Sequence, residues 1–169
     1  MTHTLLASLA IAALSTLGDF VWATWLPEHR AVYGLVHGLL LFCAIGLVLG
    51  RRAGRPGAGA AAGAAIGAAA AGAFYLLAPL LGAATMFVVW CGAWIGLGGM
   101  YARLSGSGAP ARIVLARGAM AAAASGLAFY LISGIWMPFD PQGWDYAVHF
   151  AAWTVTYFPG FAALLTVRR

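Results

Sequence analysis

Long apolar stretches, separated by short segments rich in Arg, Gly, Pro or acidic residues, make up almost the whole chain. A helix that crosses the hydrocarbon core of a bilayer needs about 20 apolar residues, and the stretches have about that length. They lack the alternation of apolar and polar residues that marks a transmembrane β-barrel. We therefore expect a single all-α transmembrane domain, residues 1–169, with helices at about 5–25, 31–50, 57–77, 81–101, 113–136 and 145–167.

The stretch 57–101 carries no charged residue and decides how many helices there are. It is too long for one span and fits two spans with a tight turn near Ala78 and Pro79. Residues 57–72 are almost all Ala and Gly, which favour insertion only weakly, so five spans are the alternative. Only six spans bring all the basic loops to one side. We expect the third helix to lie centrally, because small residues allow close helix packing.

The charged residues are sorted between the two ends of these helices. There is no Lys, and all but one of the Arg residues flank the ends that we assign to the cytoplasmic side. An excess of basic residues in short cytoplasmic loops is the rule for membrane proteins. The pattern predicts an integral membrane bundle with both termini cytoplasmic, in a bacterial inner membrane. The residues concerned are Arg51, Arg52, Arg55, Arg103, Arg112, Arg117, Arg168 and Arg169.

The composition supports lipid as the solvent. Only 8% of the residues are charged and 63% are hydrophobic, whereas about a quarter of the residues in a soluble domain are charged. The net charge of +5 does not indicate a nucleic-acid partner, because the Arg residues lie in short loops beside apolar stretches. Cys43 and Cys91 lie inside apolar stretches and are expected to be free thiols. Residues 1–15 lack a basic start and are expected to form a retained first helix.

Ionisable residues gather at the other end of the expected bundle, which we assign to the outer side. Asp19 precedes the turn at Pro27 and His37 follows it, so both lie at similar depth in neighbouring helices. His149 follows Asp145 by four residues on the sixth helix. Because a charged group facing lipid is costly, at least about 2.5 kcal/mol on insertion scales, we expect these side chains to face the bundle interior.

Four of these residues form the predicted site. Asp19, His37, Asp145 and His149 are expected to approach one another as ligands for an ion, a polar solute or a divalent metal. Asp145 has an alternative role as a first-turn acid stabilised by the helix dipole. The loop residues have an alternative role as solvated surface groups. The supporting residues are Trp22, Glu28, His29, Arg30, Tyr33, Tyr146 and Trp153.

Three functions are compatible with this pattern. The first is transport of a proton, an ion or a small polar solute, since His titrates near neutral pH. The second is a membrane redox protein, with His37 and His149 as axial haem ligands or as part of a metal site. The third is an accessory subunit or assembly factor of a larger membrane complex. Whether the chain is an enzyme stays open, although no Ser or Cys lies in a nucleophile motif.

Glycine pairs at a spacing of four predict helix faces for close packing. In lipid, such faces bring helices together within one chain or between chains. They therefore also suit a homo-oligomer or a larger membrane complex, in addition to the lipid bilayer as partner. The pairs are Gly34 and Gly38, Gly46 and Gly50, Gly63 and Gly67, and Gly92 and Gly96.

Overall fold

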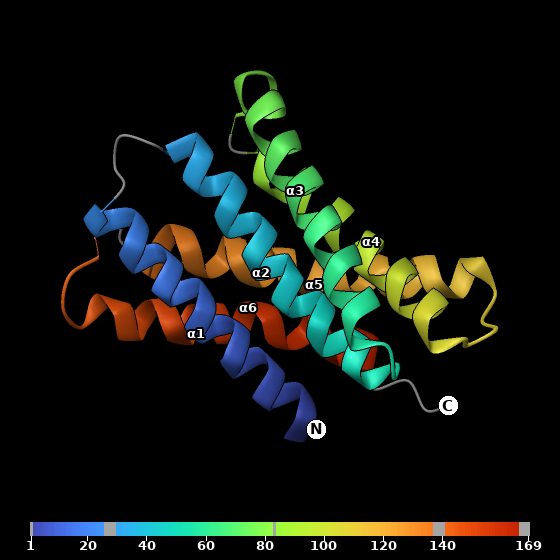
Figure 1. The fold of residues 1–169 in the computed structure, drawn as a ribbon. Coiled ribbons are helices and arrows are strands. Elements are labelled where there is room, and N and C mark those ends of the chain that lie inside the picture. Colours follow the sequence, from blue (N-terminus) through green and yellow to red (C-terminus); the bar gives the residue numbers. More distant parts are fainter. Residues whose placement is uncertain (1, 26–29, 83, 137–140, 166–169) are drawn as a thin grey trace.

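The computed structural model describes residues 2–25, 30–82, 84–136 and 141–165, which fold into six α-helices. Each helix begins and ends within a few residues of the span expected from hydropathy. Figure 1 shows a bundle in which consecutive helices run in opposite directions. The helices are α1 (Thr2–Trp25), α2 (Arg30–Arg52), α3 (Pro56–Leu81), α4 (Ala84–Ser105), α5 (Ala111–Trp136) and α6 (Asp145–Leu165).

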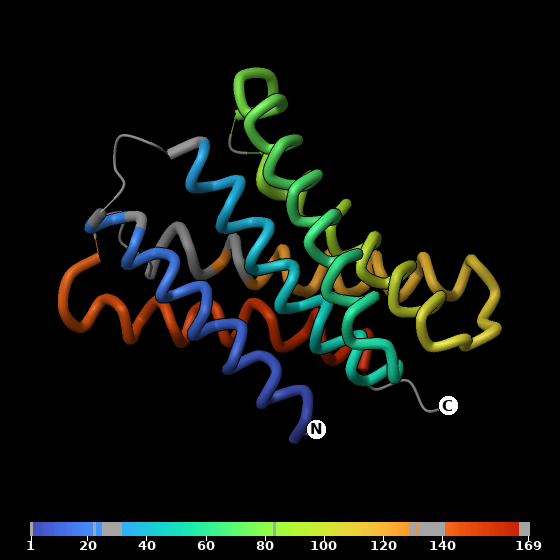
Figure 2. The backbone as a smooth tube through the Cα atoms, viewed as in Figure 1, coloured from blue at the N-terminus to red at the C-terminus, as the bar shows by residue number. Residues whose placement is uncertain are grey.

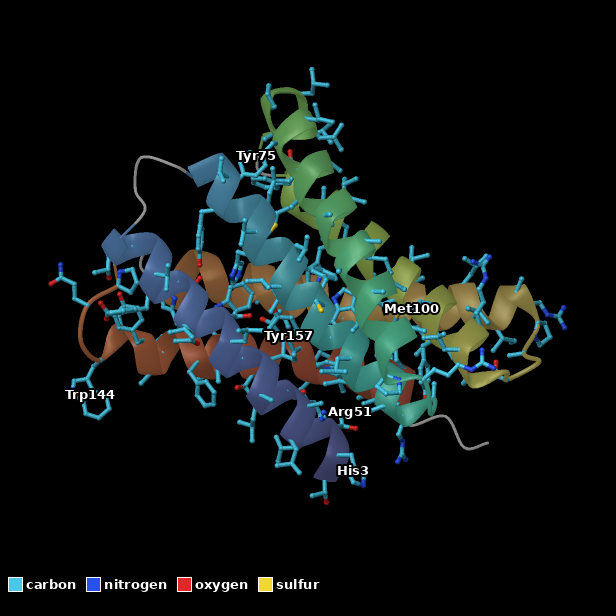
Figure 3. The ribbon with its side chains drawn as sticks, in the orientation of Figure 1. His3, Arg51, Tyr75, Met100, Trp144 and Tyr157 are labelled. Carbon is cyan, nitrogen blue, oxygen red and sulfur yellow. The ribbon has the colours of Figure 1, made fainter. Side chains whose placement is uncertain are left out.

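The two ends of the bundle differ in charge. At one end, here called the basic end, α1 begins, α6 ends, and α2 connects to α3 and α4 to α5 (Figure 1). His3 and Arg51 lie there, and Trp144 lies at the opposite end (Figure 3). The opposite end, here called the acidic end, carries Asp145 at the start of α6 and Asp19 near the end of α1. The exposed basic side chains of the basic end are Arg51, Arg52, Arg55, Arg103 and Arg112.

All six helices are long and apolar enough to cross a membrane. Large apolar side chains cover the outside of the bundle, and Leu76, Leu80 and Met120 are each more than half exposed. In water such a surface would be unfavourable, whereas in lipid it is the expected exterior. Six candidate spans in 169 residues indicate a multi-pass membrane protein.

Neighbouring helices pack mostly in chain order, and α6 closes the bundle by packing against both α5 and α1. The trace in Figure 2 follows this path from the N-terminus to the end of α6. The core lies where α6 meets α1 and α4, and Tyr157 and Phe161 of α6 are fully buried there with Trp94 and Leu97 of α4. Helix α6 is therefore the element that positions the interior side chains.

Helices α2 and α3 pack backbone to backbone along a stripe of glycines. Gly46 and Gly50 of α2 lie against Gly63 and Gly59 of α3. A Cβ atom on Gly46 would fall 2.8 Å from the Cα of Gly63, and one on Gly50 would fall 2.9 Å from the Cα of Gly59. No larger residue fits without moving a helix. Gly46, Gly50 and Gly63 thus bring two helices of the chain together as expected, whereas a Cβ atom on Gly92 would meet nothing within 4 Å.

The expectation that α3 lies at the centre of the bundle is wrong. It packs against α2 and α4 at the edge of the bundle (Figure 1). Its buried residues are Gly59, Gly63 and Gly67, which form the stripe against α2. Small residues on one face satisfy the close packing, while Ala on the remaining faces is apolar enough to meet lipid.

The turn between α3 and α4 lies later than Pro79. Helix α3 continues through Pro79 to Leu81, and Gly82 follows with a φ of +53°. Proline removes only one backbone hydrogen bond near the end of a helix, so two more residues remain helical. Gly82 then supplies the left-handed backbone conformation that other residues rarely adopt.

Candidate functional site

A polar stripe on α1 faces the interior of the bundle, as the cost of polar groups in lipid requires. Thr4, Ser8 and Ser15 are all buried, and Asp19 continues the stripe one turn further toward the acidic end. Ser8 donates a hydrogen bond to the carbonyl of Thr4, 2.9 Å away. The Ser15 and Tyr157 hydroxyls lie 3.0 Å apart. The Ser15 end of the stripe therefore contacts α6, with which α1 packs.

Asp19 is held by two N–H groups of α6. The Nδ1 atom of His149 lies 2.8 Å from Asp19 Oδ2, and the indole nitrogen Nε1 of Trp153 donates to the same oxygen over 2.7 Å. His149 and Trp153 are four residues apart, so they lie on one face of α6. An ionised carboxylate only accepts hydrogen bonds, so Nδ1 of His149 is the donor when Asp19 is ionised. Both donors fix the carboxylate in position.

His37 approaches Asp19 from α2. Its imidazole ring lies over Gly18, where a Cβ atom would fall 2.5 Å from His37 Nδ1. Tyr33 stacks on His37 with ring centroids 5.6 Å apart and donates a hydrogen bond from its hydroxyl to the carbonyl of Gly18. Gly18 thus provides the space that lets α2 bring an imidazole beside the carboxylate.

A cavity of about 250 Å³ lies beside this group of side chains. Asp19, His37 and Trp153 line it. The two ionisable side chains lie on one wall of the cavity, and the other lining residues are mostly apolar. Ligand sites in proteins have this character, with a mostly apolar wall and a few converging polar groups. The other aromatic residues and the methionine that line it are Phe42, Phe74, Tyr75, Met86, Trp90 and Tyr157.

Three aromatic residues of the cavity, Trp90, Trp153 and Tyr157, form one packed column between α4 and α6. Trp153 stacks on Tyr157 at 5.7 Å between ring centroids and on Trp90 at 6.5 Å. Trp90 also contacts Tyr157 at 5.8 Å. Tyr157 lies in the middle of the bundle (Figure 3). Rings that pack on one another in this way form a wall that holds its shape without a ligand.

A second polar contact ties the column to α5. The indole nitrogen Nε1 of Trp90 donates to the hydroxyl of Ser125 over 3.0 Å, and that hydroxyl donates to the carbonyl of Thr156 over 2.6 Å. Ser125 and Thr156 are fully buried. The orientation of Trp90 in the cavity wall is therefore fixed by α5 and α6 together.

Asp145 makes a contact of a different kind from the one predicted for it. Asp145 Oδ2 accepts a hydrogen bond of 2.9 Å from the backbone N–H of Gln142, which is the role of a residue at a helix start. It does not line the cavity. His149 does not line the cavity either, and it bonds Asp19 Oδ2 from α6.

The supporting residues fall into three groups. Tyr33 and Trp153 act directly on the group around Asp19, as described above. Tyr146 contacts Phe20 at 5.4 Å and His149 at 6.2 Å between ring centroids, so it packs beside the His149 imidazole. Glu28 and His29, and the side chains of Trp22 and Arg30, lie outside the residues that the structure describes.

The donor set does not fit a metal ion. Within residues 2–25, 30–82, 84–136 and 141–165, no three His, Cys, Asp or Glu side chains gather closely enough to hold one. His149 Nδ1 is already bonded to Asp19, and Asp145 is bonded to the loop backbone. Cys43 and Cys91 are free thiols in separate helices. Metal and haem binding therefore gain no support from this arrangement.

Sequence reasoning missed Trp90 and Tyr157. Both are central to the cavity wall, and neither carries a charge that would fix which way it points. A signal was present, because Trp153, Tyr157 and Phe161 recur every four residues on α6, as do Trp90 and Trp94 on α4. This spacing places each set on one helix face.

The chain matches no known protein family, no curated protein and no solved structure.

Proposed function

We propose that this chain binds a small organic cation in the cavity beside Asp19 and carries it across a bacterial inner membrane. The observation that supports this most is the fixed carboxylate of Asp19 at the wall of an aromatic cavity. Both termini are cytoplasmic in this proposal, so the cavity lies toward the outer face.

The charge balance favours a cation over an anion or a neutral solute. Among the described residues, the ion pair of Asp19 is with His149, and no Arg side chain pairs with this carboxylate. In this proposal Asp19 carries the negative charge and His149 is neutral, since a neutral imidazole can still donate a hydrogen bond. A partly buried charge without an opposite charge is unfavourable, and a bound cation would reduce that cost.

The aromatic wall favours an organic cation over a hydrated metal ion. Trp, Tyr and Phe rings attract cations through their electron-rich faces, with Trp the strongest. Trp90, Trp153 and Tyr157 line the cavity together with Phe74 and Tyr75. The remaining wall is apolar and offers few oxygen ligands to replace a hydration shell, whereas the alkyl or aryl groups of an organic cation would be buried favourably.

Transport is supported by the polar stripe of α1. Asp19, Ser15, Ser8 and Thr4 follow one interior face from the acidic end toward the basic end. Ile11 and Ala12 interrupt the stripe, so passage requires a conformational change there. The accumulation of a quaternary ammonium ion by liposomes containing the protein measures this activity. Binding without accumulation would restrict the function to binding.

The binding test uses benzyltrimethylammonium and Asp19→Asn, which keeps the shape of the side chain and removes its charge. We expect affinity for the cation to fall about tenfold or more. Losing the contact with a charged group should cost about 1.4 kcal/mol or more of binding free energy, and about 1.4 kcal/mol corresponds to a tenfold change in affinity. Trp90 and Trp153 line the cavity, so tryptophan fluorescence reports the titration.

Asp145→Asn is the matched control, because Asp145 is at the same end but bonds the loop backbone outside the cavity. It should change the affinity by about twofold or less. Circular dichroism confirms that both variants remain helical. Equal affinity in wild type and Asp19→Asn would exclude Asp19 as the cation ligand, and equal losses in both variants would indicate only a general effect of charge.

A further inference from the structure

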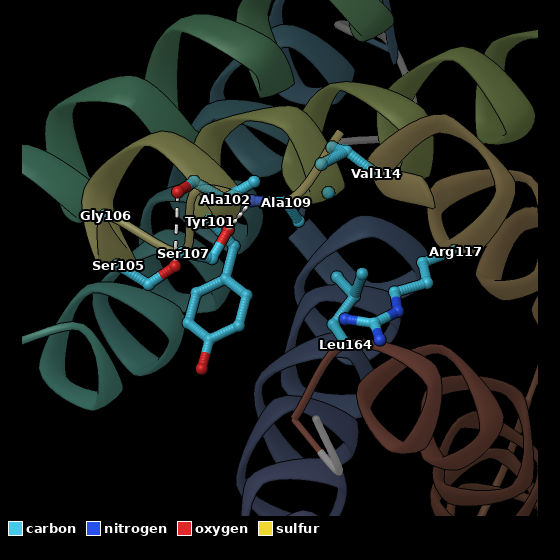
Figure 4. Close-up of a pocket in the computed structure, with 10 residues that line it drawn as sticks. Tyr101, Ala102, Ser105, Gly106, Ser107, Ala109, Val114, Arg117 and Leu164 are labelled. Atoms are coloured by element: carbon cyan, nitrogen blue, oxygen red, sulfur yellow. Dashed lines mark hydrogen bonds between the residues drawn. The ribbon is translucent and has the colours of Figure 1, made fainter. Parts of the chain in front are cut away.

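A second cavity, of about 440 Å³, lies at the basic end between α4, α5 and α6. It is here called the basic cavity, and it is separate from the cavity beside Asp19, with which it shares no lining residue. Figure 4 shows Tyr101 and Arg117 on either side of it. The lining residues are Gly98, Tyr101, Ala102, Ser105, Gly106, Ser107, Ala109, Val114, Arg117 and Leu164.

Arg117 is the charged residue of this cavity. It is six residues into α5, so its Cα lies about 9 Å along the helix from Ala111. The side chain is half-buried, and among the described residues its guanidinium has no hydrogen-bond or ion-pair partner. A guanidinium offers five N–H donors in a planar arrangement that suits carboxylate and phosphate oxygens. A half-buried guanidinium that has no protein partner is suited to bind an anion.

The rest of the cavity supplies neutral polar groups and no acid. Tyr101 presents its hydroxyl from α4. Ser105 donates to the carbonyl of Ala102 over 3.2 Å, and its oxygen can still accept. Ser107 accepts a bond of 3.4 Å from the N–H of Ala109, and its hydroxyl proton can still be donated.

The position of the cavity indicates the source of the anion. Val114 of α5 and Leu164 of α6 provide apolar walls beside the polar groups, and the exposed Arg103 and Arg112 lie on α4 and α5. Basic pockets between transmembrane helices on the cytoplasmic side bind the headgroups of anionic lipids. An acyl chain would continue along the apolar helix surface while its headgroup occupies the cavity.

We propose that the basic cavity binds the phosphate group of an anionic phospholipid, with Arg117 as the principal ligand and Tyr101 as a second donor. The site is independent of the cation cavity, and either can fail without the other. It would hold the ends of α4, α5 and α6 together at the basic end.

The test compares thermal unfolding of the detergent-purified protein with phosphatidylglycerol, phosphatidylcholine or inorganic phosphate added. Phosphatidylglycerol should raise the unfolding temperature more than phosphatidylcholine does. Arg117→Gln should weaken phosphatidylglycerol binding about tenfold, as expected for a charged hydrogen-bonded contact. Arg112→Gln removes the same charge from an exposed position of α5 outside the cavity and should retain the response.

Tyr101→Phe provides a second variant that keeps the packing and removes the hydroxyl, and it should weaken binding by a smaller factor. Inorganic phosphate that stabilises the protein as well as the lipid, in an Arg117-dependent way, would support a phosphate site with a soluble source. An equal response to phosphatidylglycerol and phosphatidylcholine would overturn the proposal. Equal effects of Arg117→Gln and Arg112→Gln would also overturn it, because surface charge would then explain the binding.

Discussion

Asp19 is a carboxylate in an apolar bundle whose two described hydrogen-bond donors are both side chains of α6, and neither of them is an Arg. Its Oδ2 atom receives the N–H groups of His149 and Trp153. Hydrogen bonds to a charged group contribute about 1.5–3 kcal/mol, which offsets part of the cost of burial without neutralising the charge. The two bonds therefore hold the carboxylate in a fixed position, which a cation site requires.

Ser125 is the residue whose loss should most directly loosen the cavity wall. Ser125→Ala leaves Nε1 of the buried Trp90 without its bond to the hydroxyl, and an unsatisfied buried donor costs about 1–3 kcal/mol. We expect a loss of stability of that size in denaturant unfolding. Ser107→Ala, at an exposed serine, should change stability by about 0.5 kcal/mol or less. Equal stability of Ser125→Ala and wild type would show that the Trp90–Ser125 bond does not support the wall.

The predictability of the site differs from residue to residue. Asp19 and His149 could be inferred from sequence, because a charged or polar side chain deep in a span must face a polar partner. Trp90 and Tyr157 could not be oriented in the same way. Both the bundle core and the surrounding lipid are apolar, so the hydrophobic pattern does not distinguish an inward ring from an outward one. Only the packing of α4 against α6 decides it.

At the scale of elements, hydropathy predicts the number of helices, but it does not predict which helices pack against one another. Apolar length and Arg placement predict six helices, and the described residues form six. The position of α3 depends instead on the match between its glycine face and that of α2. This match requires the glycines of both helices to lie at the same levels when the helices pack. The shift of the α3–α4 turn past Pro79 depends on Gly82, whose backbone conformation ends the helix.

The glycine stripe between α2 and α3 should be sensitive to a single methyl group. A Cβ atom on Gly63 would fall 2.8 Å from the Cα of Gly46, so Gly63→Ala forces the helices apart. Overpacking of this kind costs about 1–3 kcal/mol, and we expect a corresponding loss of stability in thermal or denaturant unfolding.

Gly72→Ala is the control on the same helix, because a Cβ atom there meets nothing within 4 Å. It should leave stability unchanged or raise it by a few tenths of a kcal/mol, since Ala favours the helix over Gly by up to about 1 kcal/mol. If both variants were equally stable, close backbone packing would not hold α2 to α3.

At the scale of the whole molecule, the basic and acidic ends predict an orientation in the membrane. In a variant without Cys43 and Cys91, single cysteines replace Ser107 at the basic end or Gln142 at the acidic end. Both positions are exposed. An impermeant maleimide should label the Gln142→Cys protein in intact bacterial cells and the Ser107→Cys protein only after lysis. The reverse pattern would place the Asp19 cavity toward the cytoplasm.

The two cavities lie toward opposite ends of the same bundle and differ in charge. Asp19 lies in one and Arg117 in the other. With the Arg-rich end toward the cytoplasm, the acidic cavity meets solutes from outside and the basic cavity meets the anionic inner leaflet. The same asymmetry of charge that sets the orientation would thus also select the partner at each end.

The central claim is that the charge of Asp19 selects a cation. The most direct measurement compares benzyltrimethylammonium with neopentylbenzene, a neutral molecule of the same shape, on wild type and Asp19→Asn. We predict that wild type prefers the cation by about tenfold or more and that Asp19→Asn loses this preference while still binding the neutral molecule. A wild-type protein that binds both molecules equally, or a preference that survives in Asp19→Asn, would contradict the account.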